Sequence, residues 1–162
     1  MFIYSVRART VKFVGFLILT AALLIGIAVF GSDEGVYASS TAISADYSNM
    51  RTNEDRVAFM EGFGLSVDTT PIEEHSFPIP ENFDRVILGY NELQKKQGLD
   101  LSKYSKKRVT RYTYRVTNHK SEGEVYANLF IYRGVIVACD ISSADPEGFV
   151  EPLTLLDRSK LA

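Results

Sequence analysis

The residue types that cysteine transpeptidases combine are all present in the chain: a cysteine, a histidine and an arginine. Cys139, His119 and Arg133 are the residues that could be assigned to such chemistry. The nucleophile of these enzymes is a thiolate, which requires a polar and accessible environment. Cys139 instead alternates with valine and isoleucine in the segment 135–142, so its side chain is expected to face the core. The pattern therefore favours an inert, buried thiol.

The spacing of the histidines and of the paired acidic residues does not favour a metal site or a pair of catalytic carboxylates either. His75 and His119 belong to different predicted elements, and neither has an Asp or Glu at ligand-like spacing. Glu73 and Glu74 are adjacent in an extended segment, so their carboxylates point to opposite faces. Cys139 is the only cysteine, which excludes both an intrachain disulfide and a multi-cysteine zinc site. We expect no catalytic residue, cofactor or metal.

A basic segment is the one remaining candidate for binding. From residue 95 to residue 120 there are nine Lys or Arg residues and one acid, whereas residues 46–85 hold nine acids and three bases. One hypothesis is that a basic face contacts anionic lipid headgroups or an anionic wall polymer. The alternative is a solvated strand face with salt bridges to the acidic half. The candidate binding residues are Lys106, Lys107, Arg108, Arg111 and Arg115.

Overall length and charge restrict the protein class. The 162 residues suffice for one domain of ordinary size with an additional anchor. Removing Arg7, Arg9 and Lys12 from the 18 basic residues leaves 15 against 20 acidic residues, so the remainder has a net charge near −5. Nucleic-acid binding is not expected, because it requires a basic surface.

The N-terminal region predicts a transmembrane anchor. Residues 13–32 contain no charged side chain, and as a helix they would cross about 30 Å of hydrocarbon. Arg7, Arg9 and Lys12 precede this run, while Asp33 and Glu34 follow it, so the positive-inside rule leaves the N-terminus in the cytoplasm. We expect a cytoplasmic segment at 1–12, a signal anchor at 13–32, a flexible tether at 33–50 and an extracytoplasmic domain at 51–162.

A cleaved signal peptide is the alternative for the same region. Val36-Tyr37-Ala38 offers acceptable residues for a signal peptidase, and cleavage near Ala38 would release a secreted protein. The apolar run exceeds the usual length of about 7 to 15 residues in signal peptides, so retention is favoured. No cysteine is available for lipidation near the end of the apolar run, which excludes a lipoprotein. The low cysteine content of an exported domain suits a Gram-positive bacterium.

The first half of the domain predicts two helices and two short strands. Thr52 and Asp55 form a capping-box-like start of a helix that ends at Gly64. Residues 65–69 and 72–79 look extended, and Pro78 places the second of them at a sheet edge. A second helix is expected from Pro80 to Gly98, with an apolar stripe from Phe83 to Leu93. Its outer polar face would consist of Asp84, Asn91, Glu92 and Lys95.

The sequence of the second half of the domain predicts an antiparallel sheet, against which the apolar stripe of the second helix can pack. In 109–118, Tyr112 and Tyr114 share the inward parity, and Arg111 and Arg115 share the outward one. Residues 125–132 are apolar on both parities apart from Asn128, as in a central strand, and Arg133-Gly134 turns into a third strand at 135–142. The tail 146–162 is expected to close one edge. The fold class is α+β, with two helices packed on an antiparallel sheet.

Several phrases of this domain resemble an uncharacterised bacterial family, the domain-of-unknown-function family 4830, found mainly in Firmicutes. The resemblance covers roughly residues 56–150, and Ala138-Cys139-Asp140 departs from it where the family has Gly-Gly-Asp. It implies a compact domain with an exported or membrane-anchored location; the family has no assigned activity to carry over. The matching phrases are Ile79-Pro80 with Phe83, Tyr90-Asn91-Glu92-Leu93-Gln94 with Gln97-Gly98, Arg111-Tyr112-Thr113-Tyr114 with Thr117-Asn118, and Ala127-Asn128-Leu129.

The function expected from these features is a membrane-anchored binding or interaction module at the cell envelope. A first alternative is a sensor or regulatory membrane protein that acts through partner helices, because the cytoplasmic segment is too short to form a signalling domain. Gly15, Ala22 and Gly26 could allow close approach of such a helix. A second alternative is an envelope enzyme of unrecognised type; a sortase is disfavoured because its Thr-Leu-x-Thr-Cys signature is absent.

Overall fold

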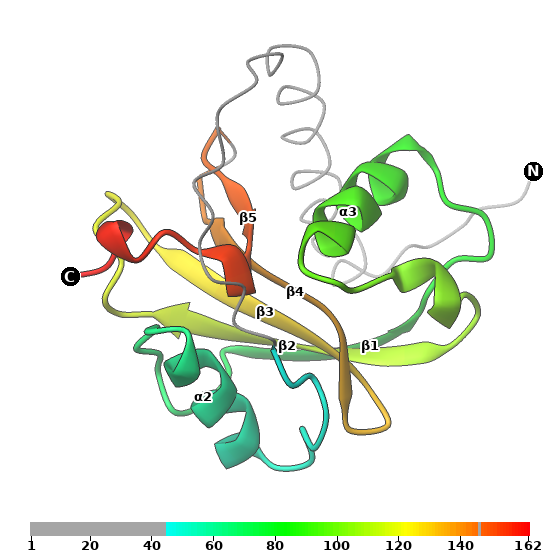
Figure 1. The fold of residues 1–162 in the computed structure, drawn as a ribbon, viewed down its shortest axis with the longest axis horizontal. Helices are drawn as coiled ribbons and strands as arrows, with labels where there is room; N and C mark the ends of the chain where they lie inside the picture. Colours follow the sequence, from blue (N-terminus) through cyan, green and yellow to red (C-terminus); the bar gives the residue numbers. More distant parts are fainter. Residues whose placement is uncertain (1–44, 146) are drawn as a thin grey trace, which may run out of the picture.

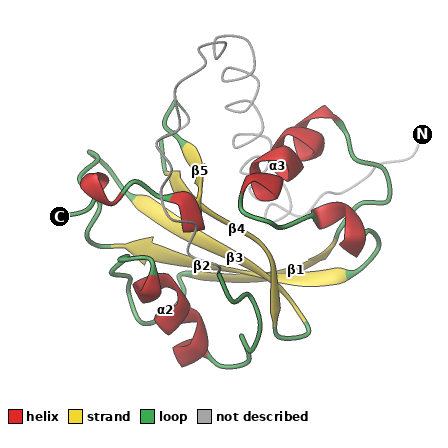
Figure 2. Ribbon diagram, in the orientation of Figure 1, coloured by secondary structure: helices red, strands yellow, loops and turns green. Residues whose placement is uncertain are grey.

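Five antiparallel strands follow one another across a single sheet in the order β1-β2-β3-β4-β5 (Figure 1). The computed structural model describes residues 45–145 and 147–162. Two α-helices and three short 3-10 helices accompany the sheet (Figure 2), which confirms the predicted α+β class. The elements are α2 (Asn53–Gly62), β1 (Glu73–Pro78), α3 (Arg85–Lys96), η1 (Leu101–Tyr104), β2 (Arg108–Val116), β3 (Val125–Tyr132), β4 (Val135–Ser143), β5 (Val150–Pro152), η2 (Leu153–Leu155) and η3 (Arg158–Lys160).

Helix α2 begins as predicted. The Thr52 hydroxyl accepts a hydrogen bond from the Asp55 backbone N–H, and the Asp55 carboxylate accepts one from the Thr52 N–H, which completes a capping box. Phe59 and Met60 bury the inner side of the helix in the larger hydrophobic core, which also contains Tyr114 of β2. The apolar spacing therefore places α2 on one face of the sheet.

The segment between the two helices forms one strand instead of the two predicted. Residues 65–69 form only an isolated bridge, between Val67 and Val116, because Asp68 and Ser66 bond to single backbone groups near the end of β2. The strand β1 lies at the sheet edge, as the proline at position 78 predicts.

Helix α3 differs from the prediction at its start and on its buried side. It begins at Arg85, because the Asp84 carboxylate accepts hydrogen bonds from the backbone N–H groups of residues 86 and 87 and caps the helix there. Pro80 therefore lies before the helix. Asn91, expected on the outer polar face, is buried together with Gln94, and the apolar residues of the helix are only half-buried or exposed. Gly98, with φ +83°, ends the helix region as predicted.

The side-chain alternation of β2 is confirmed for the aromatic residues and wrong for Arg111 and Thr113, which are both buried. Tyr114 is fully buried and Tyr112 packs against the same core. Arg111 was expected in solvent but is only 5 % exposed. Its face of the sheet is also covered, and its guanidinium forms an ion pair with the carboxylate of Glu73 in the neighbouring strand. Arg115, two residues further on, is exposed as predicted.

A β-bulge alters the predicted alternation of β4. The register between β3 and β4 shifts between Phe130 and Ile131, which leaves Val137 as an extra residue in β4. Ile136 therefore belongs to the same core as Cys139, whereas Val137 belongs to the smaller cluster on the other face. The buried environment predicted for the thiol of Cys139 is confirmed.

One side of β4 pairs with β3, and the other side forms backbone hydrogen bonds with short segments from both ends of the domain. Strand β5 pairs with residues 140–142, so the tail closes this edge as predicted. Residues 45–50, which the sequence assigns to the tether, lie beside the start of β4: the Ile136 N–H donates to the Tyr47 carbonyl (2.8 Å) and the Met50 N–H to the Gly134 carbonyl (2.8 Å). Met50 is buried in the larger core.

The predicted membrane span at 13–32 lies outside the described residues. Within residues 45–145 and 147–162, neither α-helix combines the length and apolar composition needed to traverse a bilayer.

Candidate functional site

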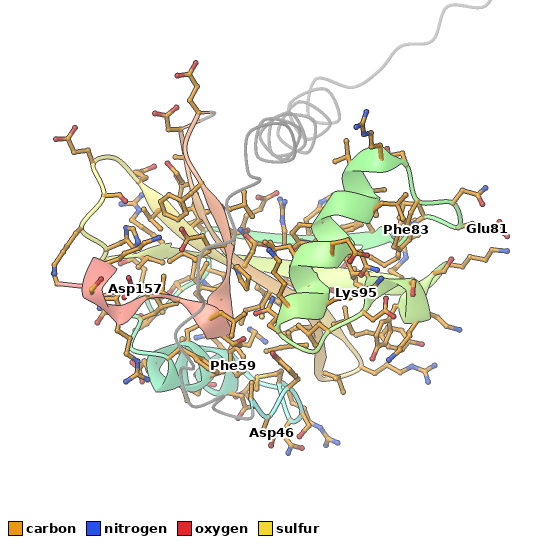
Figure 3. All side chains as sticks on the ribbon, turned by 45° about the horizontal axis from the view of Figure 1, so that its top comes forward. Asp46, Phe59, Glu81, Phe83, Lys95 and Asp157 are labelled. Atoms are coloured by element: carbon orange, nitrogen blue, oxygen red, sulfur yellow. The ribbon has the colours of Figure 1, made fainter. Side chains whose placement is uncertain are left out.

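The five cations proposed for anion binding do not form one face. Lys106, Lys107 and Arg108 lie together and exposed where the chain enters β2. The Lys106 ammonium pairs with the carboxylate of Glu81 at 2.6 Å. Glu81 lies at the periphery of the domain in the loop before α3 (Figure 3), so this pair is a surface ion pair of small energetic value.

Arg111 and Arg115 are separated from that group. Arg111 is buried and its Nη2 donates to Glu73 Oε2 at 2.8 Å. Arg115 is seven residues from Arg108, or about 23 Å along an extended strand. Its guanidinium pairs with Glu124 at 3.2 Å and lies 3.9 Å from Asp68. Arg115 is therefore neutralised at the opposite end of β2, so among these five residues only those at the entry to β2 are adjacent exposed cations.

A buried polar network, which the sequence analysis did not predict, occupies the face of the sheet that α3 covers. At its centre is Asp140 of β4, which is 4 % exposed. Tyr90 of α3 donates its hydroxyl to Asp140 Oδ2 at 2.6 Å, and Asn128 of β3 donates Nδ2 to Oδ1 at 2.8 Å. The same amide contacts Ser142 Oγ at 3.2 Å, and its oxygen accepts from Thr113 Oγ1 at 2.9 Å. The network thus links α3 to three strands.

The electrostatics of this network follow from burial. Burial raises the pKa of Asp140 above its ordinary value, while the hydrogen bonds from Tyr90 and Asn128 and the charge of Arg111 oppose this rise. Burial, followed by the charge of Asp140, holds the pKa of Tyr90 well above its ordinary value. Tyr90 therefore stays protonated and serves as a hydrogen-bond donor. Since both oxygens of Asp140 accept hydrogen bonds from neighbouring side chains, the arrangement is suited to fastening α3 to the sheet.

Two glutamine side chains at the C-terminal end of α3, Gln94 and the capping residue Gln97, bond to the backbone of Cys139. The pairing of β5 with β4 covers residues 140–142 and does not reach Cys139. At Cys139, Gln94 Oε1 accepts a hydrogen bond from the backbone N–H (2.9 Å), and Gln97 Nε2 donates one to the backbone carbonyl (2.6 Å). The two glutamine side chains thus take the place of a neighbouring strand. Burial, and then the charge of Asp140, raises the pKa of the Cys139 thiol well above its ordinary value, which disfavours a thiolate.

The histidine and arginine considered with Cys139 lie at opposite ends of the sheet. Arg133 occupies the turn after β3, next to the start of β2, whereas His119 follows the end of β2. His119 packs against Phe149 with ring centroids 5.2 Å apart, and burial followed by the charge of Lys160 lowers its pKa. The described residues therefore do not bring a Cys-His-Arg site together.

The other candidate groups are equally dispersed. His75 of β1 stacks on Phe77, with ring centroids 5.9 Å apart. Glu73 pairs with Arg111, whereas Glu74 lies opposite Tyr112, so the two carboxylates do point to different faces. Among the described residues, no three His, Cys, Asp or Glu side chains are close enough to hold a metal ion.

The polar network had a signal in the sequence, although a weak one. Arg111 and Thr113 alternate with the tyrosines of β2, and Asn128 and Asp140 are the polar residues inside apolar strands. Their common face follows only from the register, in which Thr113 lies opposite Asn128 and Asn128 opposite Asp140. Sequence alone does not provide this register.

Comparison with known proteins assigns the domain to a family without a known activity. No curated protein and no solved structure matches the chain. Residues 59–141, just over half of the chain, match the family described as "Domain of unknown function (DUF4830)". The match runs from the middle of α2 through most of β4, and so includes α3 and every residue of the polar network except Ser142. The chain therefore belongs to the DUF4830 family.

Proposed function

We propose that the protein is a membrane-anchored extracytoplasmic interaction module. The observation on which this rests is the uncharged run of residues 13–32, with cations before it and acids directly after it. In water such a run would require complete burial, whereas in a bilayer its length matches the hydrocarbon core.

The organisation of the folded domain supports this proposal. The buried side chains that form the two described hydrophobic clusters come from residues 50–153, on both faces of the sheet. The first described residues enter beside the edge of β4 at Tyr47, so the chain reaches the domain from one side. A separate, twelve-residue segment at 33–44 would then connect the anchor to the domain.

The chemistry of the described residues favours binding over catalysis. A nucleophile needs a base within hydrogen-bond reach and access to a substrate. The thiol of Cys139 is buried, with Gln97 Oε1 at 3.5 Å, and the acidic group of the polar network, Asp140, is held by Tyr90 and Asn128. These groups stabilise the domain.

Cysteine labelling in intact cells tests the predicted topology, because the native thiol is buried. We expect a membrane-impermeant maleimide to label the exposed variant Ser121→Cys from outside the cell and to leave the wild-type chain unlabelled. Ser5→Cys, which precedes the uncharged run, should react only after permeabilisation. Labelling of Ser5→Cys but not Ser121→Cys in intact cells would contradict the orientation, and recovery of labelled Ser121→Cys in the culture medium would contradict the anchor.

A further inference from the structure

Two cations occupy backbone positions that ordinarily favour other residues. Lys106 has φ 62° and Arg133 has φ 50°; the third described non-glycine residue with positive φ is Asn49. Asparagine and glycine adopt this left-handed conformation most readily, whereas long side chains do so at a cost. The Arg133-Gly134 turn, in particular, would be favoured as Asn-Gly. A long basic side chain at a strained backbone position is therefore a candidate functional residue.

Both positions lie at the same end of the sheet. Thr110 of β2 pairs with Ile131 of β3, so the start of β2 and the turn after β3 are adjacent. The hydrogen bond from the Met50 N–H to the Gly134 carbonyl brings the neighbouring Arg51 to the same turn. We name this surface the basic end. It comprises six exposed cations: Arg51, Lys103, Lys106, Lys107, Arg108 and Arg133.

The basic end keeps an excess of positive charge. Glu81 pairs with Lys106, and the nearby carboxylates of Asp46 and Asp55 accept backbone hydrogen bonds from Ser48 and from residues 51 and 52. Asp100, which caps η1 before Lys103, and Glu54, next to Asp55, are further acids in this region, so the six cations exceed these five acids by one. At the opposite end, Arg115 is matched by two acids, Glu124 and Asp68.

Aromatic rings lie beside these cations. Tyr104 of η1 and Tyr132 at the end of β3 are half-buried and contact each other edge to face, with ring centroids 5.7 Å apart. The Arg133 guanidinium lies 5.3 Å from the centre of the Tyr132 ring. Tyrosine combined with Lys and Arg is typical of the boundary between membrane and water.

We propose that the basic end contacts the anionic lipid headgroups of the membrane in which the chain is anchored. This inference rests on the proposed function. Positive residues near an anionic leaflet are attracted within about a Debye length. Residues 33–44 can extend to at most about 40 Å, which keeps the domain close enough for such contact. The surface consists of the entry to β2 and the turn after β3; Arg111 and Arg115 are not part of it.

The test uses the full chain in vesicles and compares the two ends of the domain. A fluorophore is attached at Asn82→Cys, an exposed site beside Glu81, or at Ser121→Cys at the opposite end; the native Cys139 is buried and should not react. Vesicles contain a headgroup-linked quencher and either zwitterionic lipid alone or about one third anionic lipid. We expect stronger quenching at Asn82→Cys than at Ser121→Cys, only with anionic lipid, and its loss at 1 M salt, where the Debye length is about 3 Å.

Two charge-removing variants supply the matched comparison. Lys106→Asn with Arg133→Asn removes two cations and places asparagine where the backbone favours it, so folding should be preserved or improved. Each lost cation should reduce the ratio of membrane-facing to solvent-facing molecules about fivefold. Arg115→Gln with Lys120→Gln removes the same charge at the other end and should leave the quenching unchanged.

Three results would overturn the inference. If the labelled chain enters vesicles and resists alkaline carbonate, but quenching is equal at both ends or indifferent to anionic lipid, the lipid contact is wrong while the anchor stands. Failure to enter vesicles would refute the anchor and the lipid contact together. Quenching that is independent of lipid charge, together with binding of a soluble polyglycerol phosphate that Lys106→Asn with Arg133→Asn abolishes, would assign the basic end to a wall polymer instead.

Discussion

Replacing Tyr90 with phenylalanine removes one hydrogen bond to a buried carboxylate and leaves the ring in place. The Tyr90 hydroxyl lies 2.6 Å from Asp140 Oδ2, on a residue that is 4 % exposed, and hydrogen bonds to charged groups contribute about 1.5 to 3 kcal/mol. We expect Tyr90→Phe to lower the free energy of unfolding by about 2 kcal/mol at neutral pH. The aromatic contact of this ring with Phe130, at a centroid distance of 5.8 Å, should persist.

The loss should depend on pH in a defined direction. Burial raises the pKa of Asp140 in the folded protein above the ordinary value of 3.8, so its carboxyl takes up a proton in the folded state at a higher pH than in the unfolded state. The energetic cost of burying the charge is therefore present at neutral pH and disappears as the pH falls toward 3.8. Because the Tyr90 hydroxyl favours the ionised carboxylate, the difference between Tyr90→Phe and the wild type should shrink over the same interval.

The single native cysteine provides the assay. Cys139 is buried in the larger core, so a thiol reagent reaches it only when the domain opens, and the labelling rate reports the opening equilibrium. A loss of about 2 kcal/mol corresponds to about thirtyfold faster labelling. Tyr104→Phe, which keeps the contact with Tyr132, is the control and should label at nearly the wild-type rate. Labelling of Tyr90→Phe within threefold of wild type at pH 7, or an acceleration that does not diminish with acid, would refute the role of this bond.

Three further substitutions test other contacts by the same labelling assay. Gln97→Leu leaves the buried carbonyl of Cys139 without its donor and should destabilise the domain by about 1 to 3 kcal/mol; a rate equal to wild type would contradict the edge-completing role. Thr52→Ala removes the cap of α2 and should cost about 1 kcal/mol, whereas Thr52→Asn should be nearly neutral. Arg56→Met removes the 2.8 Å bond to the Tyr114 hydroxyl and should cost more than 1 kcal/mol; no effect would mean that the bond contributes nothing.

The helices and strands could be predicted where local signals agree with burial. The capping box at Thr52, the edge position of Pro78 and the turn at Arg133-Gly134 are all local features, and the structure confirms them. The predicted start of α3 is wrong, because Pro80 and Asp84 are both residues that favour a helix start. In the structure the Asp84 carboxylate caps the helix.

The buried polar residues could not be predicted, because burial of a charge depends on its partners. Alternation alone placed Arg111 in solvent, and only the pairing of β1 with β2 brings Glu73 next to it. Asn91 likewise looked like a surface residue of α3, yet its side chain bonds to Asp100 and to the Leu101 N–H. Polar contacts between segments distant in sequence require the three-dimensional arrangement.

The spatial grouping of the basic residues also could not be predicted from the sequence. Counting charges identified a basic segment, but β2 is long enough to separate its two ends, and acids from other loops neutralise Arg115. Arg133 and Arg51 come from outside the segment and reach the entry to β2 through the hairpin and the first described residues.

The anchor is tested most directly by alkaline carbonate extraction of membranes from cells that express the full chain, followed by intact mass measurement. Retention of the uncharged run in the bilayer predicts that the protein stays in the pellet with a mass that includes residues 1–38. Release into the supernatant, or a mature chain that begins near Ser39, would contradict the account.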